Sequence, residues 1–164
     1  HNRDEVYRLA QRVCVLDQGT SQPVQTTRDL FDRPVTQAAA LLSGCKNYTR
    51  CRAADDGRIY AEDWGVYLRC SQPIPEDICL LGVRRHYVRP APPQGENTIP
   101  CTILQIIDDV FSTIVLLRPC SAPPDALYPT LEMELEKAAW AALERRAGEI
   151  IHVSAASEDL LLLH

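Results

Sequence analysis

The chain has 164 residues, of which 24% are charged, and its formal net charge is −5 at pH 7. This acidic balance argues against a nucleic-acid partner, because protein surfaces that bind nucleic acid are normally basic. No stretch approaches eighteen uninterrupted apolar residues, so direct insertion into a membrane is not expected. The N-terminus also lacks the basic-then-apolar pattern of a signal peptide. We therefore expect one or two small domains, with any membrane link made through a partner protein.

The number and spacing of the cysteines bear on metal binding and on redox state. There are seven, and no two are spaced as Cys-x-x-Cys. Zinc sites usually show such short paired spacings, so no metal site is expected. Cys14 and Cys79 stand in apolar runs that resemble strands. We expect reduced, buried thiols of a cytosolic protein rather than a disulfide framework.

The sequence pattern changes several times within the first 25 residues. After His1 comes a polar-apolar stretch that suits a short helix, then an apolar run over residues 13–16 and a turn at residues 17–19. Residues 20–25 suit a weak polar strand or a loop. The segment therefore predicts a helix, a strand and a turn in close succession.

Two short helices are predicted next. Thr27 can cap the first of them, because its hydroxyl can accept from free amides of the first turn. Pro34 disfavours helix at the residue before it and so ends that helix. The second is predicted over residues 35–42 and ends at Gly44.

Short apolar runs separated by turn residues fill the middle of the chain. The candidate strands cover residues 49–53, 58–61, 65–70, 79–83, 99–107 and 111–117. Asp55-Asp56-Gly57 is a good hairpin turn because glycine accepts a positive φ. Proline-rich loops are expected over residues 89–100 and 119–129. Many short strands at regular spacing suggest a small barrel.

The last part of the chain predicts a strand, a helix and a strand. Residues 131–136 alternate leucine or methionine with glutamate, which is the period of two of a strand with one buried face. Strong helix formers follow and end at Gly148. We expect Trp140, in that helix, to pack in the core. A final strand is predicted over residues 149–153.

These features together resemble two adjoining parts of one family, of which the first covers residues 1–47. This stretch resembles the end of the nucleotide-binding domain of an ABC transporter ATPase, with its switch histidine, helix and strand ending in an LDxG turn. The positions that fit the following helices of the family are Leu30, Phe31, Pro34, Ala40, Gly44 and Asn47. The chain departs from the family where residues 25–27 replace Gly-Thr-Pro and where Ser43 replaces an apolar residue.

The resemblance implies a role for His1 only in the parent ATPase. There the histidine would reach the γ-phosphate of ATP, and the parent subunit would use ATP and Mg²⁺. This chain has no phosphate loop, no LSGGQ-like element and no apolar strand ending in Asp-Glu. Without those parts it cannot position a nucleotide. We therefore expect no enzyme activity and no cofactor for the chain by itself.

Residues 48–164 resemble the TOBE domain, a small OB-like barrel that follows the nucleotide-binding domain in many ABC importers. Residues 82–91 match one TOBE strand at Gly82, Arg84, His86, Val88 and Pro90. Residues 96–106 match the start of a molybdate-type unit at Asn97, Ile99 and Ile103, with Cys101 in place of glycine. The resemblance implies a mainly β fold with short helices, an OB-like barrel preceded by a helical and strand remnant of the ATPase domain.

Related domains of molybdate importers bind the oxyanion, and the resemblance extends to candidate residues here. The candidates are Asn97, Thr98, Lys137, Ser154 and Ser157, which offer amides, hydroxyls and one cation. Oxyanion sites need such donors in a partly dry pocket. Two features argue against binding: Ala155 stands where relatives carry a lysine, and Glu158 would repel an anion. The alternative is that these groups serve turns and caps of a structural or dimer-forming domain.

The resemblance predicts the C-terminal regulatory portion of an importer ATPase subunit, with molybdate or tungstate as the candidate ligand. It implies two partners, a second copy of the chain and the permease, and a cytoplasmic location on the inner face of the membrane. The alternatives are a free-standing oxyanion-binding module, or an importer ATPase for sulfate, iron or a polyamine.

One structural expectation concerns residues 1–44. Without the rest of an ATPase domain, the strand over residues 12–16 would have unpaired edges and an exposed apolar face. We therefore expect this segment to be partly disordered, packed on the barrel or exchanged between protomers.

Overall fold

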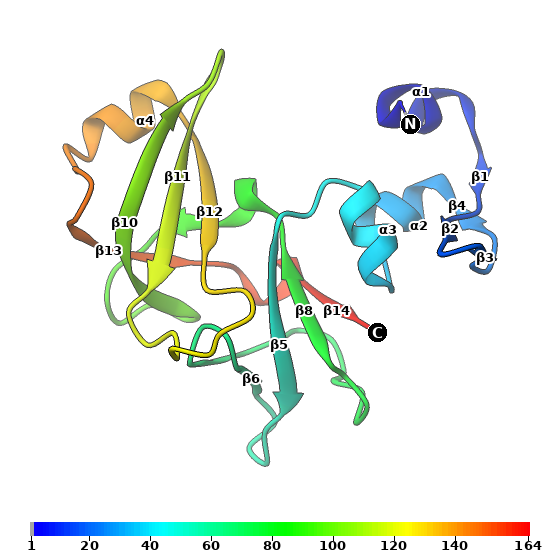
Figure 1. Cartoon of the computed structure of the whole chain (residues 1–164), viewed down its shortest axis with the longest axis horizontal. Coiled ribbons are helices and arrows are strands. Elements are labelled where there is room, and N and C mark those ends of the chain that lie inside the picture. The colour runs from blue at the N-terminus through cyan, green and yellow to red at the C-terminus, as the bar shows by residue number, and fades with distance from the viewer. Residues whose placement is uncertain (1) are drawn as a thin grey trace.

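Antiparallel strands dominate the computed structural model, which describes residues 2–164 (Figure 1). One five-stranded sheet contains, in order of pairing, β12 (Leu131–Glu136), β11 (Ser112–Pro119), β10 (Thr98–Asp108), β13 (Ile150–Ser154) and β9 (Arg89–Pro90). The other contains β14 (Leu160–Leu163), β8 (Leu80–Val83), β5 (Asn47–Ala53), β6 (Ile59–Ala61) and β7 (Val66–Leu68). The two sheets form a nearly closed barrel, and the prediction of a mainly β, OB-like fold is confirmed.

A smaller group of elements precedes the barrel and stands beside it in Figure 1. It consists of α1 (Arg3–Leu9), β1 (Arg12–Val13), β2 (Leu16–Asp17), β3 (Thr20–Ser21), β4 (Gln25–Thr26), α2 (Thr27–Asp32) and α3 (Gln37–Leu42). β1 pairs with β4, and β2 pairs with β3. The predicted helix, strand and turn are therefore present. His1 lies outside the described residues.

The caps of the short helices follow side-chain chemistry, with one correction. Thr26, not Thr27, is the N-cap of α2, and its hydroxyl accepts from the amide of Asp29 at 3.1 Å. Thr27 lies inside the helix, and its hydroxyl donates to the carbonyl of Ala10 at 2.6 Å. Two consecutive threonines offer the same capping group, and the long-range contact to Ala10 decides which of them is used.

The six candidate strands of the middle region are all present, but two further strands were missed. Residues 82–91, which resemble a single strand, are divided by a 3-10 turn, η1 (Arg85–Tyr87), between β8 and β9. The expected proline-rich loop therefore begins with a short strand at Arg89–Pro90. β14 was also missed, because an unbroken run of four leucines has no period of two.

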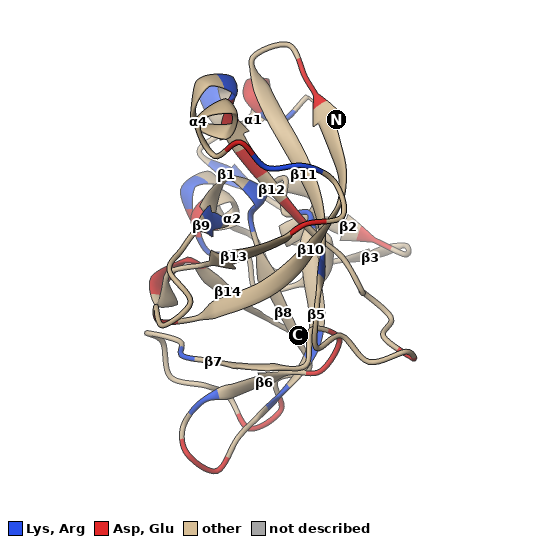
Figure 2. Ribbon diagram, turned by 90° about the vertical axis from the view of Figure 1, so that its left-hand side faces the viewer, with Lys and Arg blue, Asp and Glu red and all other residues tan. Residues whose placement is uncertain are grey.

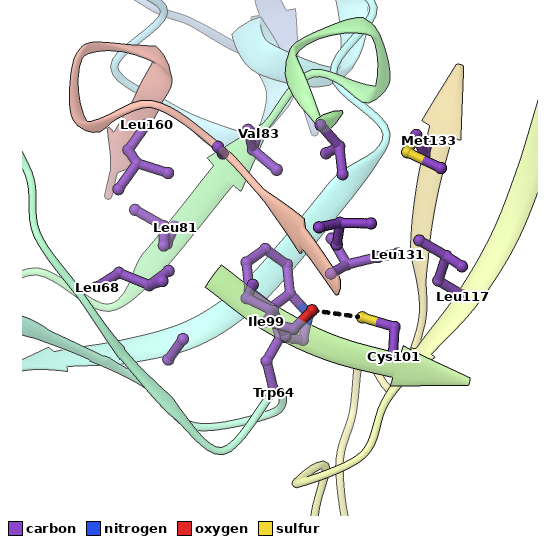
Figure 3. Packing of buried hydrophobic residues seen from close by; sticks show 14 of the residues in the cluster. Trp64, Leu68, Leu81, Val83, Ile99, Cys101, Leu117, Leu131, Met133 and Leu160 are labelled. Atoms are coloured by element: carbon purple, nitrogen blue, oxygen red, sulfur yellow. Dashed lines mark hydrogen bonds between the residues drawn. The ribbon is translucent and has the colours of Figure 1, made fainter. Parts of the chain in front are cut away.

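The core lies between the two sheets and is built by alternate residues of long strands. In β12, Leu131, Met133 and Leu135 are buried while the intervening glutamates, red in Figure 2, are partly exposed. Figure 3 shows Leu131 and Trp64 among the buried side chains of this cluster. The helix α4 (Lys137–Ala142) adds Trp140, which is buried as predicted. One apolar face on each of β10, β11 and β12 thus lines the interior, and the four residues of β8 are all buried.

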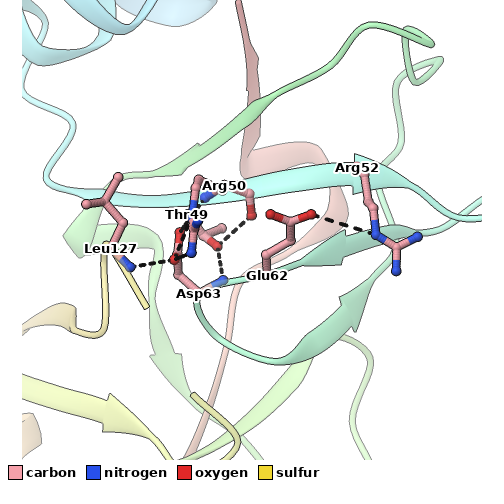
Figure 4. Close-up of polar contacts among 6 residues, drawn as sticks. All are labelled: Thr49, Arg50, Arg52, Glu62, Asp63 and Leu127. Atoms are coloured by element: carbon pink, nitrogen blue, oxygen red, sulfur yellow. Dashed lines mark hydrogen bonds and ion pairs between the residues drawn. The ribbon is translucent and has the colours of Figure 1, made fainter. Parts of the chain in front are cut away.

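A buried carboxylate joins two segments of the second sheet to the loop between β11 and β12 of the first (Figure 4). Asp63 is fully buried and accepts from Arg50 through Nη2 at 2.6 Å and through the backbone amide at 2.7 Å. It also accepts from the amide of Leu127 at 2.7 Å. Burial alone would raise the pKa of Asp63, but the hydrogen bonds from Arg50 and the two amides outweigh it and lower that pKa.

The cysteines are reduced, but fewer are buried than the sequence predicts. All seven are free thiols, and Cys14, Cys79 and Cys120 are exposed. Burial raises the pKa of Cys51 and of Cys101, in each case to about 12. Cys14 lies between the short strands β1 and β2, and Cys79 directly precedes β8, so both stand just outside regular strands.

Residues 2–44 pack on the barrel through α2, α3 and the residues beside them, which agrees with the second of the three expectations for this segment. The buried Arg84 donates to the carbonyl of Ser43 at 2.6 Å, to its hydroxyl at 3.1 Å and to the carbonyl of Phe31. Ala40 joins an apolar cluster that includes Leu161 and Leu163 of β14. No helix within residues 2–164 has the length and apolar character that crossing a membrane requires.

Candidate functional site

The loop before β10 fixes the position of the first predicted site residue, Asn97. Its φ is +54°, a left-handed conformation that asparagine tolerates better than most residues. The side-chain oxygen accepts from the amide of Arg69 at 2.7 Å, and the nitrogen donates to the carbonyls of Arg69 and Ala155 at 2.8 and 3.2 Å. The side-chain amide of Asn97 is therefore engaged in hydrogen bonds that join three segments, and these hydrogen bonds shape the loop.

Two of the predicted residues, Thr98 and Ser154, meet on the outer face of the first sheet. Thr98 of β10 is directly opposite Ser154 of β13, and Ser154 is directly opposite Arg89 of β9. The neighbouring Ile99 and Val153 are buried, so Thr98 and Ser154 point outward. The register thus places two hydroxyls and one guanidinium side by side, and we call Thr98, Ser154 and Arg89 the outer row.

The other two predicted residues are placed differently. Ser157 lies in the turn η2 (Ser157–Asp159), just after β13, where its hydroxyl donates to Glu158 at 3.3 Å. Lys137 is at the far end of β10, where its ammonium pairs with Asp108 at 2.8 Å. Thr98 and Asp108 are the two ends of β10, about 30 Å apart at the usual rise of a strand. Lys137 therefore cannot share a small ligand with the outer row, and Arg89 is the cation there.

Neighbouring titratable groups leave Arg89 as the positive charge of this region at neutral pH. Burial and the nearby Arg84 lower the pKa of His86, with a smaller contribution from Arg89, so its imidazole is neutral. Burial and the adjacent Glu158 raise the pKa of Asp159. Within residues 2–164, Arg89 forms no ion pair. Its guanidinium can therefore turn toward an anion on the outer row.

The arrangement suits an oxyanion more than a metal. The Ser154 hydroxyl can donate to an oxyanion, and the Arg89 guanidinium can donate to two oxygens at once. The Thr98 hydroxyl donates to the carbonyl of Pro92 at 3.1 Å, so it would have to exchange that bond for one to a ligand. In the part of the chain that the structure describes, no three histidine, cysteine or acidic side chains gather as metal ligands. The outer row is thus a candidate binding site for a small tetrahedral anion at the sheet surface.

Sequence reasoning missed Arg89 for a clear reason. Residues 89–100 were interpreted as one proline-rich linker, and a two-residue strand inside it has no periodicity to detect. The pairing of β9 with β13 joins residues far apart in the chain, so no local signal places Arg89 beside Ser154. The one available hint was a basic residue immediately before Pro90, where an extended conformation is favoured.

Comparisons with known proteins bear on both parts of the chain. No protein-family model matches it. Over 114 residues, or 65% of the chain, it is 28% identical to the sn-glycerol-3-phosphate import ATP-binding protein UgpC of Yersinia enterocolitica. The match covers 32% of that protein, so the chain spans about a third of the length of this curated relative.

A solved structure provides a second comparison. The cytoplasmic molybdate-binding protein ModG, crystallised with molybdate bound, is similar with a TM-score of 0.57 at 14% sequence identity. The match covers 71% of this chain and 94% of ModG. At this identity the likeness shows a shared fold. The chain thus has a weak sequence similarity to an importer ATP-binding subunit and the fold of a known oxyanion-binding protein.

Proposed function

We propose that the chain is the C-terminal regulatory portion of the ATP-hydrolysing subunit of an ABC importer, and that its barrel binds an oxyanion, with molybdate as the first candidate. The observation that carries the proposal is the outer row, where Arg89, Ser154 and Thr98 stand side by side on adjacent strands. The fold shared with a molybdate-binding protein supports the choice of anion. The sequence similarity to an import ATP-binding protein supports the parent subunit.

Calorimetric titration of the purified chain with molybdate and tungstate tests the binding, with sulfate as the competing anion. We expect Arg89→Gln to weaken molybdate binding about tenfold or more, because a charge-assisted contact is lost. Ser154→Ala should have a smaller effect in the same direction. Arg145→Gln is the matched control, because Arg145 is exposed and away from the outer row. Binding that is unchanged in Arg89→Gln would exclude the outer row.

The absence of any molybdate or tungstate binding would leave a second role for the barrel. In that case the domain would support dimerisation of the subunit, and the transported solute would again be open among sulfate, iron and polyamines. Sedimentation of the chain at increasing concentration tests the proposed homodimer. A monomer at every concentration would exclude self-association through this portion alone.

Two further parts of the proposal concern the parent subunit. We propose that it binds ATP and Mg²⁺, and that it reaches the inner face of the membrane through the permease. The chain itself should show no ATP hydrolysis above a buffer control, because it lacks the residues that would hold the phosphates and Mg²⁺. Measurable turnover would contradict this.

A free-standing oxyanion-binding module remains the alternative function. The coverage of 94% of ModG favours it, since almost all of that protein is matched by this chain. The two proposals differ in what residues 2–44 do. Binding of the full chain to a purified importer permease would favour the subunit, and unchanged molybdate affinity after removal of residues 2–44 is expected from both.

A further inference from the structure

A second polar hollow lies beside the β6–β7 hairpin, and none of its lining residues belongs to the outer row. Its volume is about 310 Å³, and it is lined by Arg58, Tyr67, Arg69 and residues 94–97. This volume is at the lower end of the range for small-molecule sites. The hollow is therefore large enough for a small organic molecule and larger than a single tetrahedral anion needs.

Two arginines face this hollow from adjacent strands. Ile59 of β6 is opposite Leu68 of β7, and both are buried. Because side chains alternate along a strand, Arg58 and Arg69 point to the opposite, outer face, as Tyr67 does. Arg58 directly precedes Ile59 and Arg69 directly follows Leu68, so the two arginines are the next opposite pair beyond the end of this ladder. Their side chains therefore start from neighbouring positions.

Contacts with Asp56 and Tyr67 orient the guanidinium of Arg58 but engage only two of its three nitrogens. Its Nε donates to the Asp56 carboxylate at 2.7 Å, and its Nη2 lies 2.6 Å from the same carboxylate oxygen. Its Cζ lies 4.7 Å from the centre of the Tyr67 ring. No contact of Nη1 with another of the described residues is found. Ring and carboxylate thus orient the group, and Nη1 is available to a ligand.

Arg69 is anchored through its backbone rather than its side chain. Asn97 accepts from the Arg69 amide at 2.7 Å and donates to its carbonyl at 2.8 Å. The side chain is exposed, and within residues 2–164 it forms no ion pair. Asn97, in its left-handed conformation, therefore fixes the backbone of Arg69, whose guanidinium has no ion-pair partner among residues 2–164.

We propose that this hollow binds a phosphate monoester of a small hydroxylated molecule, with the phosphate between Arg58 and Arg69. Guanidinium groups match phosphate oxygens in geometry and in charge. Gln94 and Glu96, which line the same hollow, can accept hydrogen bonds from hydroxyl groups of the organic part. The Glu96 carboxylate disfavours a bare anion, so the hydroxylated part contributes to selectivity.

The test uses the full chain and glucose 6-phosphate as the probe, followed by calorimetry or by chemical-shift changes. Arg69→Gln and Arg58→Gln should each weaken binding about tenfold or more, since each removes a charge-assisted contact. Arg52→Gln is the matched control: Arg52 also lies over a tyrosine ring, 5.0 Å from the centre of Tyr60, but does not line the hollow. It should change the affinity less than twofold.

Inorganic phosphate and glucose separate the two halves of the ligand. We expect phosphate to bind at least tenfold more weakly than the ester, and glucose to show no measurable binding. Equal affinity for phosphate and ester, no ester binding, or ester binding that persists in Arg69→Gln would each overturn the proposal. Urea unfolding of each variant checks that it is folded.

The outer row and the hollow are separate proposals, and a mutation in one should not change the affinity of the other for its ligand. Arg89→Gln should leave the affinity for glucose 6-phosphate unchanged, and Arg69→Gln should leave the affinity for molybdate unchanged. A loss of ester binding in Arg89→Gln would mean that the ester occupies the outer row, which would overturn the assignment to the hollow.

Discussion

The buried carboxylate of Asp63 joins β5 to the loop that contains Leu127, with Arg50 as its charged partner. Replacing it by alanine leaves two backbone amides inside the protein without an acceptor. We expect Asp63→Ala to lower the free energy of unfolding by about 2–4 kcal/mol, because unsatisfied buried groups are costly. Urea denaturation measures this. Asp55→Ala, at an exposed turn, should remain within about 0.5 kcal/mol of the wild type.

The same residue predicts an acid sensitivity. The pKa of Asp63 is lowered in the folded protein, so its contribution to stability is complete above the unfolded pKa of about 4 and is lost as the pH falls through the folded value. The wild type should therefore lose more stability than Asp63→Asn between about pH 6 and pH 3. Parallel losses in the two proteins would show that other carboxylates dominate.

For single residues, the sequence predicts which types of side chain a site contains better than it predicts which residues contact one another. Thr98 and Ser154 are both candidate residues from the sequence, and the register places them opposite each other. Lys137 was expected in the same site, but it lies at the other end of β10 and pairs with Asp108. Arg89 takes its place through a strand pairing that no local pattern reveals. Charge complementarity between distant segments depends on register, which only the folded chain defines.

Among the elements, the turn between β6 and β7 has the strictest requirement for glycine. Gly65 has a φ of +68°, and a Cβ there would collide with the carbonyl of Ser121. Gly57 has a similar φ of +76°, but a Cβ would meet nothing within 4 Å. We expect Gly65→Ala to cost about 2 kcal/mol or more and Gly57→Ala about 1 kcal/mol, measured by thermal or urea unfolding. Equal losses would mean that the backbone conformation alone decides.

The attachment of α2 and α3 to the barrel depends on Arg84. Arg84→Met removes the donors that reach Phe31 and Ser43. Residues 2–44 should then be cleaved faster by limited proteolysis and exchange amide hydrogens faster, while the barrel keeps its own unfolding transition. The neighbouring Arg85→Met is the control, because Arg85 pairs with Glu132 and Glu134 inside the barrel unit. Faster cleavage in both variants would argue against a specific role for Arg84.

Predicting the elements from the sequence succeeded where periodicity was strong. β12 was recognisable because leucine and methionine alternate with glutamate, and β10 and β11 because they are rich in β-branched residues. β9 was missed because it has two residues, and β14 because its leucines are continuous. Both missed strands exist through pairing with β13 and β8, so tertiary contacts rather than local preference create them.

On the scale of the whole molecule, closure of the barrel depends on its last strand. Leu160 and Leu163 of β14 are fully buried, and β14 pairs with β8 along its whole length. A chain that stops after Ala156 should lose cooperative unfolding, since β8 would have an unpaired edge and the core an open side. Circular dichroism during heating measures this. A chain that lacks only His164 should keep a cooperative transition, because it loses a single hydrogen bond, from the His164 amide to the carbonyl of Val35 at 3.0 Å, and no residue of β14.

The barrel architecture was predictable because short strands and turns recur along the chain. Many short strands with turns between them indicate a barrel whatever the details, and the family resemblance indicates which barrel. The order of strands could not be predicted, because β14 inserts beside β8 and β9 beside β13 across long stretches of chain. The sequence leaves three alternatives for residues 2–44, since contacts between distant segments, such as those of Arg84 with Phe31 and Ser43, decide their position.

The pairing of β14 with β8 also has a consequence for biosynthesis. A ribosome releases β8 long before it has made Leu160, so the growing chain carries a strand whose partner does not yet exist. Until β14 emerges from the exit tunnel, the edge of β8 is open to other chains and to chaperones. The barrel can therefore close only after β14 has emerged, and slow translation of the stretch between β8 and β14 would prolong the interval in which this chain is prone to aggregate.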